Sequence, residues 1–215
     1  MAQFTLGAFA CCLFVTAGST ACGKGSPSNG EAAPVSTESP VAAVDAAPEA
    51  LSKLSFPDTM LVDQSGKDVR IYSDLIRGRT VAINFVFTSC TAICPTMGVT
   101  FAKLQTDLAH NGPPNVLLLS VSIDPATDTP ERLAAFRDKV GGKPGWTLLT
   151  GPKPEVDALL KAVQAFTPDF QAHSPMVLMG NDRSGRWVRA NGLAPASQLA
   201  TMLRQLESAP KGAQQ

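Results

Sequence analysis

Residues 56–206 alternate between short apolar segments that are typical of strands and longer segments with helical periodicity. The clearest buried strand is expected at residues 81–87, which read VAINFVF. Pro95 begins a helical stretch that ends near His110, because proline suits the first turn of a helix. An alternation of this kind predicts an α/β fold in which a central sheet is covered by helices.

The other expected elements complete this pattern, with one hairpin at the N-terminal end of the domain and another near its C-terminal end. They are a hairpin of residues 60–62 and 69–71, strands at residues 116–123 and 146–149, a hairpin of residues 176–179 and 187–189, a helix after Thr129-Pro130-Glu131, and helices at residues 154–165 and 195–206. Cys90 and Cys94 fall at the junction between the buried strand and the first helix, and a cysteine pair at that junction indicates a thioredoxin-like fold.

The five cysteines are unevenly distributed, because Cys11, Cys12 and Cys22 lie in the first 22 residues and only Cys90 and Cys94 lie in the rest. Two cysteines cannot form the scaffold of a disulfide-rich fold, and a domain of this length buries a core without one. The pair is therefore free for chemistry.

Three residues separate Cys90 from Cys94, one more than in thioredoxin and its reductive relatives. At the entry to a helix, free backbone N–H groups and the helix dipole favour the thiolate, which metal binding and disulfide exchange both need. The spacing lets the pair close a disulfide or converge on one soft ion, copper(I) above all, whereas a structural zinc site would need four protein ligands. The alternative is that both cysteines are buried packing residues, although an exported pair this close would tend to oxidise.

His173 is one of two histidines and directly precedes the strand expected at residues 176–179. In a thioredoxin-like fold the loop before that strand faces the cysteine pair, so the imidazole is a candidate third metal ligand. A lone histidine is more often an ordinary surface residue, and from the residues alone that alternative stays open. We assign no role to His110.

The N-terminal part of the chain differs in composition from the rest. Residues 1–21 hold an apolar stretch followed by small residues, which is the outline of a signal peptide, and the stretch is short for a membrane span of about 20 residues. Small residues directly precede Cys22, so we expect a lipoprotein signal with Cys22 as the acylated residue; the alternatives are an uncleaved anchor and a plain secretory signal. Gly, Ser, Pro and Ala dominate residues 22–50, which predicts a flexible tether. The folded domain is then expected at residues 51–208, followed by a disordered tail at residues 209–215.

Three segments of the expected domain stand out together. They are FTSCTAICP at residues 87–95, SIDPATDTPE at residues 122–131, and His173-Ser174. In this order and at these separations they resemble the hallmark segments of the Sco family, also called SenC or PrrC, over roughly residues 52–208. The resemblance implies a thioredoxin-like α/β fold with a central mixed sheet flanked by helices.

The same resemblance implies that Cys90, Cys94 and His173 bind copper(I) or copper(II), and that the two cysteines cycle between dithiol and disulfide. Asp124 matches an acidic residue in a loop near the metal, and its alternative role is to cap that loop with its carboxylate before Pro125.

Two positions depart from the family pattern without removing a ligand. Thr91 stands where the family commonly has Pro, and Ala172 stands where it often has Asp. We expect a looser cysteine loop and weaker control of the orientation of His173.

As a function, the resemblance implies a copper-binding metallochaperone that helps to assemble the copper A centre of cytochrome c oxidase. The alternative is a thiol-disulfide reductase that acts on cysteines of an oxidase subunit, and a peroxidase of the peroxiredoxin type is a less favoured third. The implied partners are the oxidase subunit that carries the copper A site, other periplasmic copper carriers and thiol reductants, at the periplasmic side of a bacterial cell envelope. The 18 basic and 18 acidic residues balance, so charge gives no argument for a nucleic-acid partner.

Overall fold

The sheet is organised around β4 (Thr80–Val86), whose seven residues are all buried. β4 pairs in parallel with β5 (Val116–Ser122) on one edge and antiparallel with β7 (Met176–Asn181) on the other. A strand with neighbours on both edges and helices on both faces needs a mainly apolar sequence, as β4 has. The computed structural model describes residues 47–51, 54–113 and 115–208, all within one compact unit.

The other strands extend this centre into an eight-stranded mixed sheet with the order β1-β8-β7-β4-β5-β6-β2-β3. The pairs β4–β5 and β5–β6 are parallel, and the remaining pairs in the described residues are antiparallel. The bounds of the outer strands are β1 (Glu49–Leu51), β2 (Met60–Asp63), β3 (Asp68–Arg70), β6 (Trp146–Thr150) and β8 (Arg186–Asn191).

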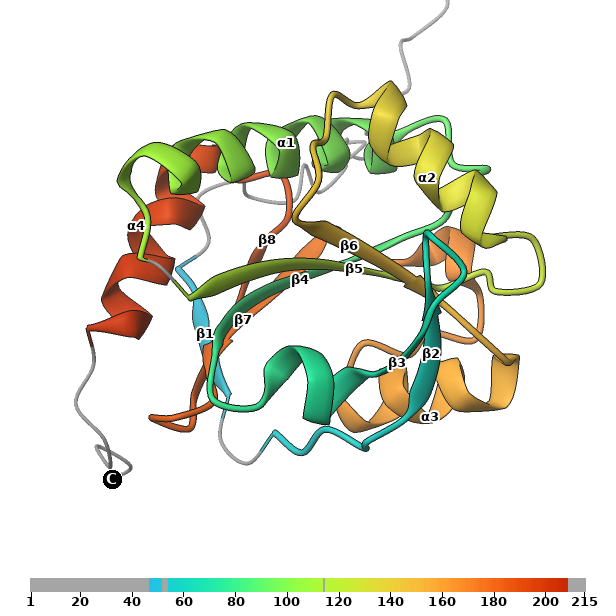
Figure 1. The fold of residues 1–215 in the computed structure, drawn as a ribbon, viewed down its shortest axis with the longest axis horizontal. Helices are drawn as coiled ribbons and strands as arrows, with labels where there is room; N and C mark the ends of the chain where they lie inside the picture. The colour runs from blue at the N-terminus through green and yellow to red at the C-terminus, as the bar shows by residue number, and fades with distance from the viewer. Residues whose placement is uncertain (1–46, 52–53, 114, 209–215) are drawn as a thin grey trace, which may run out of the picture. The chain divides into compact units, whose positions relative to one another are not determined.

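Helices cover both faces of the sheet (Figure 1). α1 (Ile93–Asn111) and α2 (Pro130–Lys139) lie above the central strands in that view, and α4 (Ala196–Glu207) packs against α1 at the left. α3 (Lys153–Ala162) and a π-helical turn (Ile71–Ile76) lie below the strands. Gly98 of α1 faces Val140 at the end of α2, where a Cβ atom would approach a Val140 methyl to 2.9 Å. The absence of a side chain at Gly98 therefore lets the start of α1 pack close to α2.

The expected central mixed sheet flanked by helices is confirmed, and so is the N-terminal hairpin, formed by β2 and β3. Every expected strand and helix is present with slightly shifted ends. The sequence did not predict β1, the π-helical turn or the 3-10 turn Phe170–Ala172, since each is too short to show a periodicity. β1 pairs with β8 and straddles the boundary expected at residue 50.

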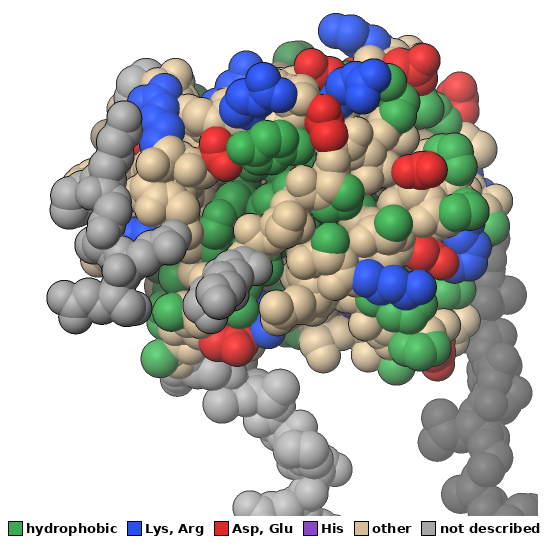
Figure 2. Space-filling view, turned by 90° about the horizontal axis from the view of Figure 1, so that it is seen from below, with side chains coloured by type: hydrophobic (Ala, Val, Ile, Leu, Met, Phe, Trp, Pro, Cys, Tyr) green, Lys and Arg blue, Asp and Glu red, His purple; other side chains and the backbone are tan. Residues whose placement is uncertain are grey.

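The expectations for the signal peptide, for acylation of Cys22 and for the tail at residues 209–215 concern residues outside the described part of the chain. Within the described part, no helix combines the length and apolar character that a membrane span needs. On the face shown in Figure 2, basic and acidic side chains are interspersed with small groups of hydrophobic ones, so no field of a single sign dominates it.

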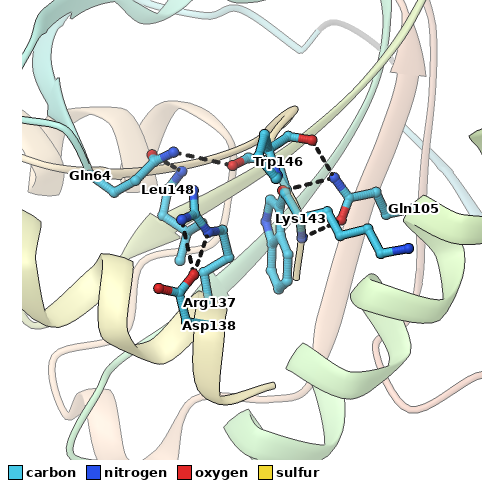
Figure 3. Close-up of polar contacts among 8 residues, drawn as sticks. Gln64, Gln105, Arg137, Asp138, Lys143, Trp146 and Leu148 are labelled. Carbon is cyan, nitrogen blue, oxygen red and sulfur yellow. Dashed lines mark hydrogen bonds and ion pairs between the residues drawn. The ribbon is translucent and has the colours of Figure 1, made fainter. Parts of the chain in front are cut away.

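Two glutamine side chains replace backbone partners around β6 (Figure 3). Gln64 follows β2 and donates from Nε2 to the Trp146 carbonyl at 3.2 Å, while its Oε1 accepts from the Leu148 N–H at 2.8 Å. Gln105 of α1 holds the loop that leads into β6, donating to the Lys143 carbonyl at 2.9 Å and accepting from the Lys143 N–H at 2.9 Å. These amides satisfy backbone groups that no strand reaches.

Replacing Gln64 with Ala should lower the free energy of unfolding by about 1–2 kcal/mol, because two backbone groups of β6 lose their partners. Urea denaturation would measure the change. Gln198→Ala, at an exposed position of α4, is the matched control. Equal stabilities of the two variants would contradict the role given to Gln64.

Candidate metal and thiol site

Cys90 and Cys94 lie where the loop after β4 enters α1. A turn closed by the Cys90 N–H and the Phe87 carbonyl at 3.2 Å brings the chain back toward the helix. No side-chain oxygen caps α1 at Ala92; instead the Cys94 N–H donates to Sγ of Cys90 at 3.4 Å. The sulfur of Cys90 thus occupies the place of a helix cap, among N–H groups that have no partner inside the helix.

The two thiols differ in exposure and in pKa. Cys90 is half-buried; burial alone would raise its pKa, but hydrogen bonds from Cys94, Ala92 and Ile93 outweigh burial and lower the pKa below the ordinary value. Cys94 is 1% exposed, and its burial, reinforced by the neighbouring Cys90 and by the charge of Asp128, raises its pKa to about 12. Cys90 is therefore the nucleophilic member of the pair, and Cys94 is held as a thiol.

A buried carboxylate, Asp128, holds the loop that carries Cys90. Asp128 is 1% exposed, and its Oδ1 accepts from the Thr88 N–H at 3.0 Å and from the Thr88 hydroxyl at 2.6 Å. Its Oδ2 accepts from the Ser122 hydroxyl at 2.6 Å, which ties the loop to the end of β5. Arg132 of α2 completes the group by donating from Nε to the Thr88 hydroxyl at 3.0 Å.

Sequence reasoning did not identify Asp128; it considered Asp124 instead, either as an acidic residue near the metal or as the carboxylate that caps the loop. In the structure the backbone carbonyl of Asp124, not its carboxylate, accepts from the Thr127 and Asp128 N–H groups at 3.0 and 2.9 Å. Among the described residues nothing donates to the Asp124 carboxylate, so the expectation of a carboxylate cap is wrong. The sequence shows only that Asp128 directly precedes Thr129, whose side chain caps α2, and this position does not reveal that the Asp128 carboxylate binds Thr88.

His173 follows the 3-10 turn Phe170–Ala172 at the start of the β7 segment. It is 7% exposed, and its ring lies against Phe85 of β4 with 6.0 Å between ring centroids. Burial lowers the pKa of His173, which favours the neutral imidazole that binds metals. Its Nε2 is buried without a hydrogen-bond partner among the described residues. A buried polar atom left unpaired costs about 1–3 kcal/mol, so Nε2 is a strong candidate to meet a ligand.

The sheet brings His173 and the two cysteines to the same end of the central strands, but the structure does not join them into one site. β4 ends where the antiparallel β7 begins, and Phe87 packs edge-on against Phe170 at 5.1 Å between centroids. Nevertheless, in the described part of the chain no three His, Cys, Asp or Glu side chains lie close enough to hold one ion. The three predicted ligands share an edge and remain unassembled.

Cys90 and His173 line two separate cavities. A cavity of 240 Å³ beside Cys90 is lined by Thr88, Cys90, Pro95, Arg132, Ala135, Phe136, Lys139 and Val140. A cavity of 630 Å³ beside His173 is lined on its other sides by the start of the chain's described part, the segment after α3, and β8. Sequence reasoning did not anticipate that residues of α2 would flank Cys90.

The match to known proteins covers most of the described domain. A family model described as SCO1/SenC matches residues 52–205, which is well over half of the chain. The chain belongs to the SCO1/SenC family. An SCO1 protein homolog of Bacillus subtilis (strain 168) is 33% identical over 90 residues, which are 41% of this chain and 45% of that protein. The chain thus spans about half the length of the curated relatives that it matches.

Solved structures of Sco proteins share the fold. A SCO1/SenC family lipoprotein from Bacillus anthracis str. Ames matches 72% of this chain and 96% of its own, with a TM-score of 0.63 and 25% identity. BsSco, a Sco-family cytochrome c oxidase assembly protein in which a disulfide switch was identified, matches 74% and 98% at 0.60 and 25%. ScoI of Bradyrhizobium japonicum with copper bound matches 70% and 98% at 0.58 and 22%, a likeness of fold. The expected thioredoxin-like fold is confirmed.

Iodoacetamide at about pH 8 should alkylate Cys90 much faster than Cys94, because the reaction follows the thiolate fraction and only Cys90 has a lowered pKa. As the pH rises, the midpoint of Cys90 labelling should fall below the ordinary cysteine pKa, while labelling of Cys94 should still be rising above it. Peptide mapping by mass spectrometry measures both sites in one sample. Equal labelling of the two cysteines would contradict the asymmetry.

Asp128→Ala should destabilise the domain by about 3 kcal/mol, because the Thr88 and Ser122 donors lose a charged acceptor. Thermal or urea unfolding measures this loss. Asp124→Ala is the control, since that carboxylate accepts no hydrogen bond from the described residues, and it should cost much less. A reversed order would show that Asp124 holds the loop.

Proposed function

We propose that this protein binds copper through Cys90, Cys94 and His173 and delivers it during assembly of the copper A centre of cytochrome c oxidase. Membership of the SCO1/SenC family supports the copper and oxidase parts of this proposal, since relatives of the same fold are known with copper bound and as oxidase assembly proteins. The observation that carries the ligand set is the unpartnered, buried Nε2 of His173 at the same sheet edge as the cysteine pair.

The donor set suits copper better than other metals. Two thiolates and one neutral imidazole are soft to intermediate ligands, which copper(I) accepts with low coordination numbers. Zinc in a structural site would need a fourth protein ligand. Copper is the cargo in this scheme, so a site with only three protein ligands is an advantage, because a partner's ligands can replace those of the protein one at a time.

Loading requires the cysteine loop and the His173 segment to approach each other. The His173 segment packs through aromatic rings, with His173 against Phe85 of β4 and Phe170 against Phe87 at the start of the cysteine loop, and apolar contacts of this kind allow sliding without breaking hydrogen bonds. Ala172 places no acidic group beside His173, so packing against Phe85 holds the ring in place of a carboxylate. Thr91 in place of Pro leaves the cysteine loop freer to move.

The redox state of the pair controls loading. Both thiolates are consumed when Cys90 and Cys94 form a disulfide, so the oxidised protein holds copper weakly. BsSco, in which a disulfide switch was identified, supports this coupling.

The site is placed at a membrane surface in this proposal. Cys22 carries the lipid, the residues between Cys22 and β1 act as a tether, and the domain faces the periplasm of a bacterial envelope. The support is the lipoprotein signal outline in the sequence and the description of the Bacillus anthracis relative as a lipoprotein. A tether lets the domain reach a membrane-bound acceptor.

The reduced protein should bind one equivalent of copper(I) tightly, and His173→Ala should lose at least tenfold in affinity because one of three ligands is removed. Competition with a chelator of known affinity measures the constant, with copper(II) tested separately. His110→Ala is the matched control, since it removes the other histidine at an exposed place on α1. If both histidine variants bind like the parent, the ligand assignment fails.

The second candidate function is a thiol-disulfide reductase acting on cysteines of an oxidase subunit. The asymmetry between a reactive Cys90 and a buried, protonated Cys94 favours it, because this is the arrangement that disulfide exchange uses. The reductase needs no imidazole. His173→Ala that keeps full exchange activity while copper binding stays weak in the parent would make the reductase the better assignment.

A further inference from the structure

One side of α2 lines the cavity that contains Cys90. Arg132, Ala135, Phe136 and Lys139 all line the 240 Å³ cavity that contains Cys90. Their spacing of three, four and seven residues places them on one side of the helix. Phe136 is a buried apolar part of the lining, and Arg132 and Lys139, about two helical turns apart, add two cations to it.

The charge of this cavity is not balanced by its own lining. No acidic residue is among its lining residues. Neither the Nη atoms of Arg132 nor Nζ of Lys139 meets an acceptor within the described ranges, whereas the neighbouring Asp138 is paired with Arg137 at 2.9 Å. Asp128 lies beneath Thr88 and offsets part of the Arg132 charge, so Lys139 supplies the less compensated cation.

We propose that this cavity binds a small thiol or disulfide that carries carboxylate groups and presents its sulfur to Cys90. The two cations fit carboxylates, the apolar part of the lining fits a short aliphatic chain, and Cys90 is the half-buried, reachable thiol of the pair. A cavity of 240 Å³ lies below the usual range for drug-sized ligands, so it suits one half of a disulfide of low molecular mass rather than a protein segment.

The exchange begins when the Cys90 thiolate attacks one sulfur of the bound disulfide. A bond forms between Sγ of Cys90 and that sulfur, the disulfide bond of the ligand breaks, and the first thiolate leaves. Cys94 then releases its proton to solvent and attacks Sγ of Cys90, which expels the second thiolate. In sum, the two protein thiols lose two electrons and form one disulfide, and the ligand gains those electrons and becomes two thiols. The reverse sequence returns the pair to the dithiol.

This inference rests on the proposed function, because it names the small-molecule partner that would set the redox state on which copper loading depends. It adds two residues, Arg132 and Lys139, whose role is to select the charge of that partner. Neither residue is required for copper to bind.

The test compares two disulfides on the reduced full-length protein, namely oxidised glutathione, which carries carboxylates, and bis(2-hydroxyethyl) disulfide, which is neutral. Lys139→Gln should lower the rate ratio of the charged to the neutral disulfide by about two- to fivefold at low salt, the range expected for one exposed charge pair. In the parent protein the same ratio should fall as salt is added. A ratio that Lys139→Gln leaves unchanged overturns the proposal, and so does an equal loss with both disulfides.

Two variants separate charge from loop geometry. Lys143→Gln removes one positive charge from the loop after α2, outside the cavity, and should leave the ratio as it is in the parent. Arg132→Lys keeps the charge but loses the Nε donor to Thr88, so it should keep the ratio even if both rates change together. A ratio that falls equally with Lys143→Gln would show that only the overall charge matters.

A further measurement needs no variant. S-methylglutathione, which has the carboxylates but no free thiol, should slow alkylation of Cys90 by neutral iodoacetamide in the parent protein. If S-methylglutathione gives no protection up to its solubility limit, the proposal that this cavity binds such compounds is overturned. Normal copper binding with no charge preference in exchange defeats this inference alone, whereas loss of copper binding with the charge preference intact defeats the proposed function alone.

Discussion

The junction between β4 and α1 is the constraint on which the rest of the site depends. β4 is fixed on both edges by β5 and β7, so the point at which the chain leaves the sheet is fixed as well. α1 starts seven residues beyond the end of β4 and must present its unpaired N–H groups to something. Cys90 supplies the acceptor, so the same feature ends the loop, starts the helix and stabilises a thiolate.

One buried carboxylate, Asp128, has two roles at this junction. The buried Asp128 accepts three hydrogen bonds and links the cysteine loop to the end of β5 and, through Thr88, to α2. Its negative charge also acts on Cys94, helping to keep that thiol protonated. Structural support and control of reactivity are thus combined in one side chain, and changing it affects both.

Much of this could be predicted from the sequence, for identifiable reasons. The fold was predictable because long periodic segments such as residues 81–87 and 95–110 carry strong signals, and the cysteine pair at their junction indicated the fold type. The placement of His173 at the same end of the sheet as the cysteines followed from its position just before a strand of a thioredoxin-like fold. The role of Asp128 and the presence of Arg132 and Lys139 beside Cys90 were not predictable, because each depends on which side chains a loop or a helix turns toward Cys90. The separation between His173 and the cysteines was also invisible, since sequence order gives neighbours but no distances.

The difference in exposure between the two sulfurs has a consequence for the order of events. The sulfur of Cys94 is buried, with the residue 1% exposed, and cannot be the first atom that an arriving molecule meets, whereas Cys90 is half-buried and lines a cavity. An incoming molecule therefore reacts first with the sulfur of Cys90, and the buried sulfur of Cys94 reacts second. Two identical residues therefore act in a fixed order. Bonds to an incoming molecule form and break at Cys90, and Cys94 determines only the lifetime of the species bound there.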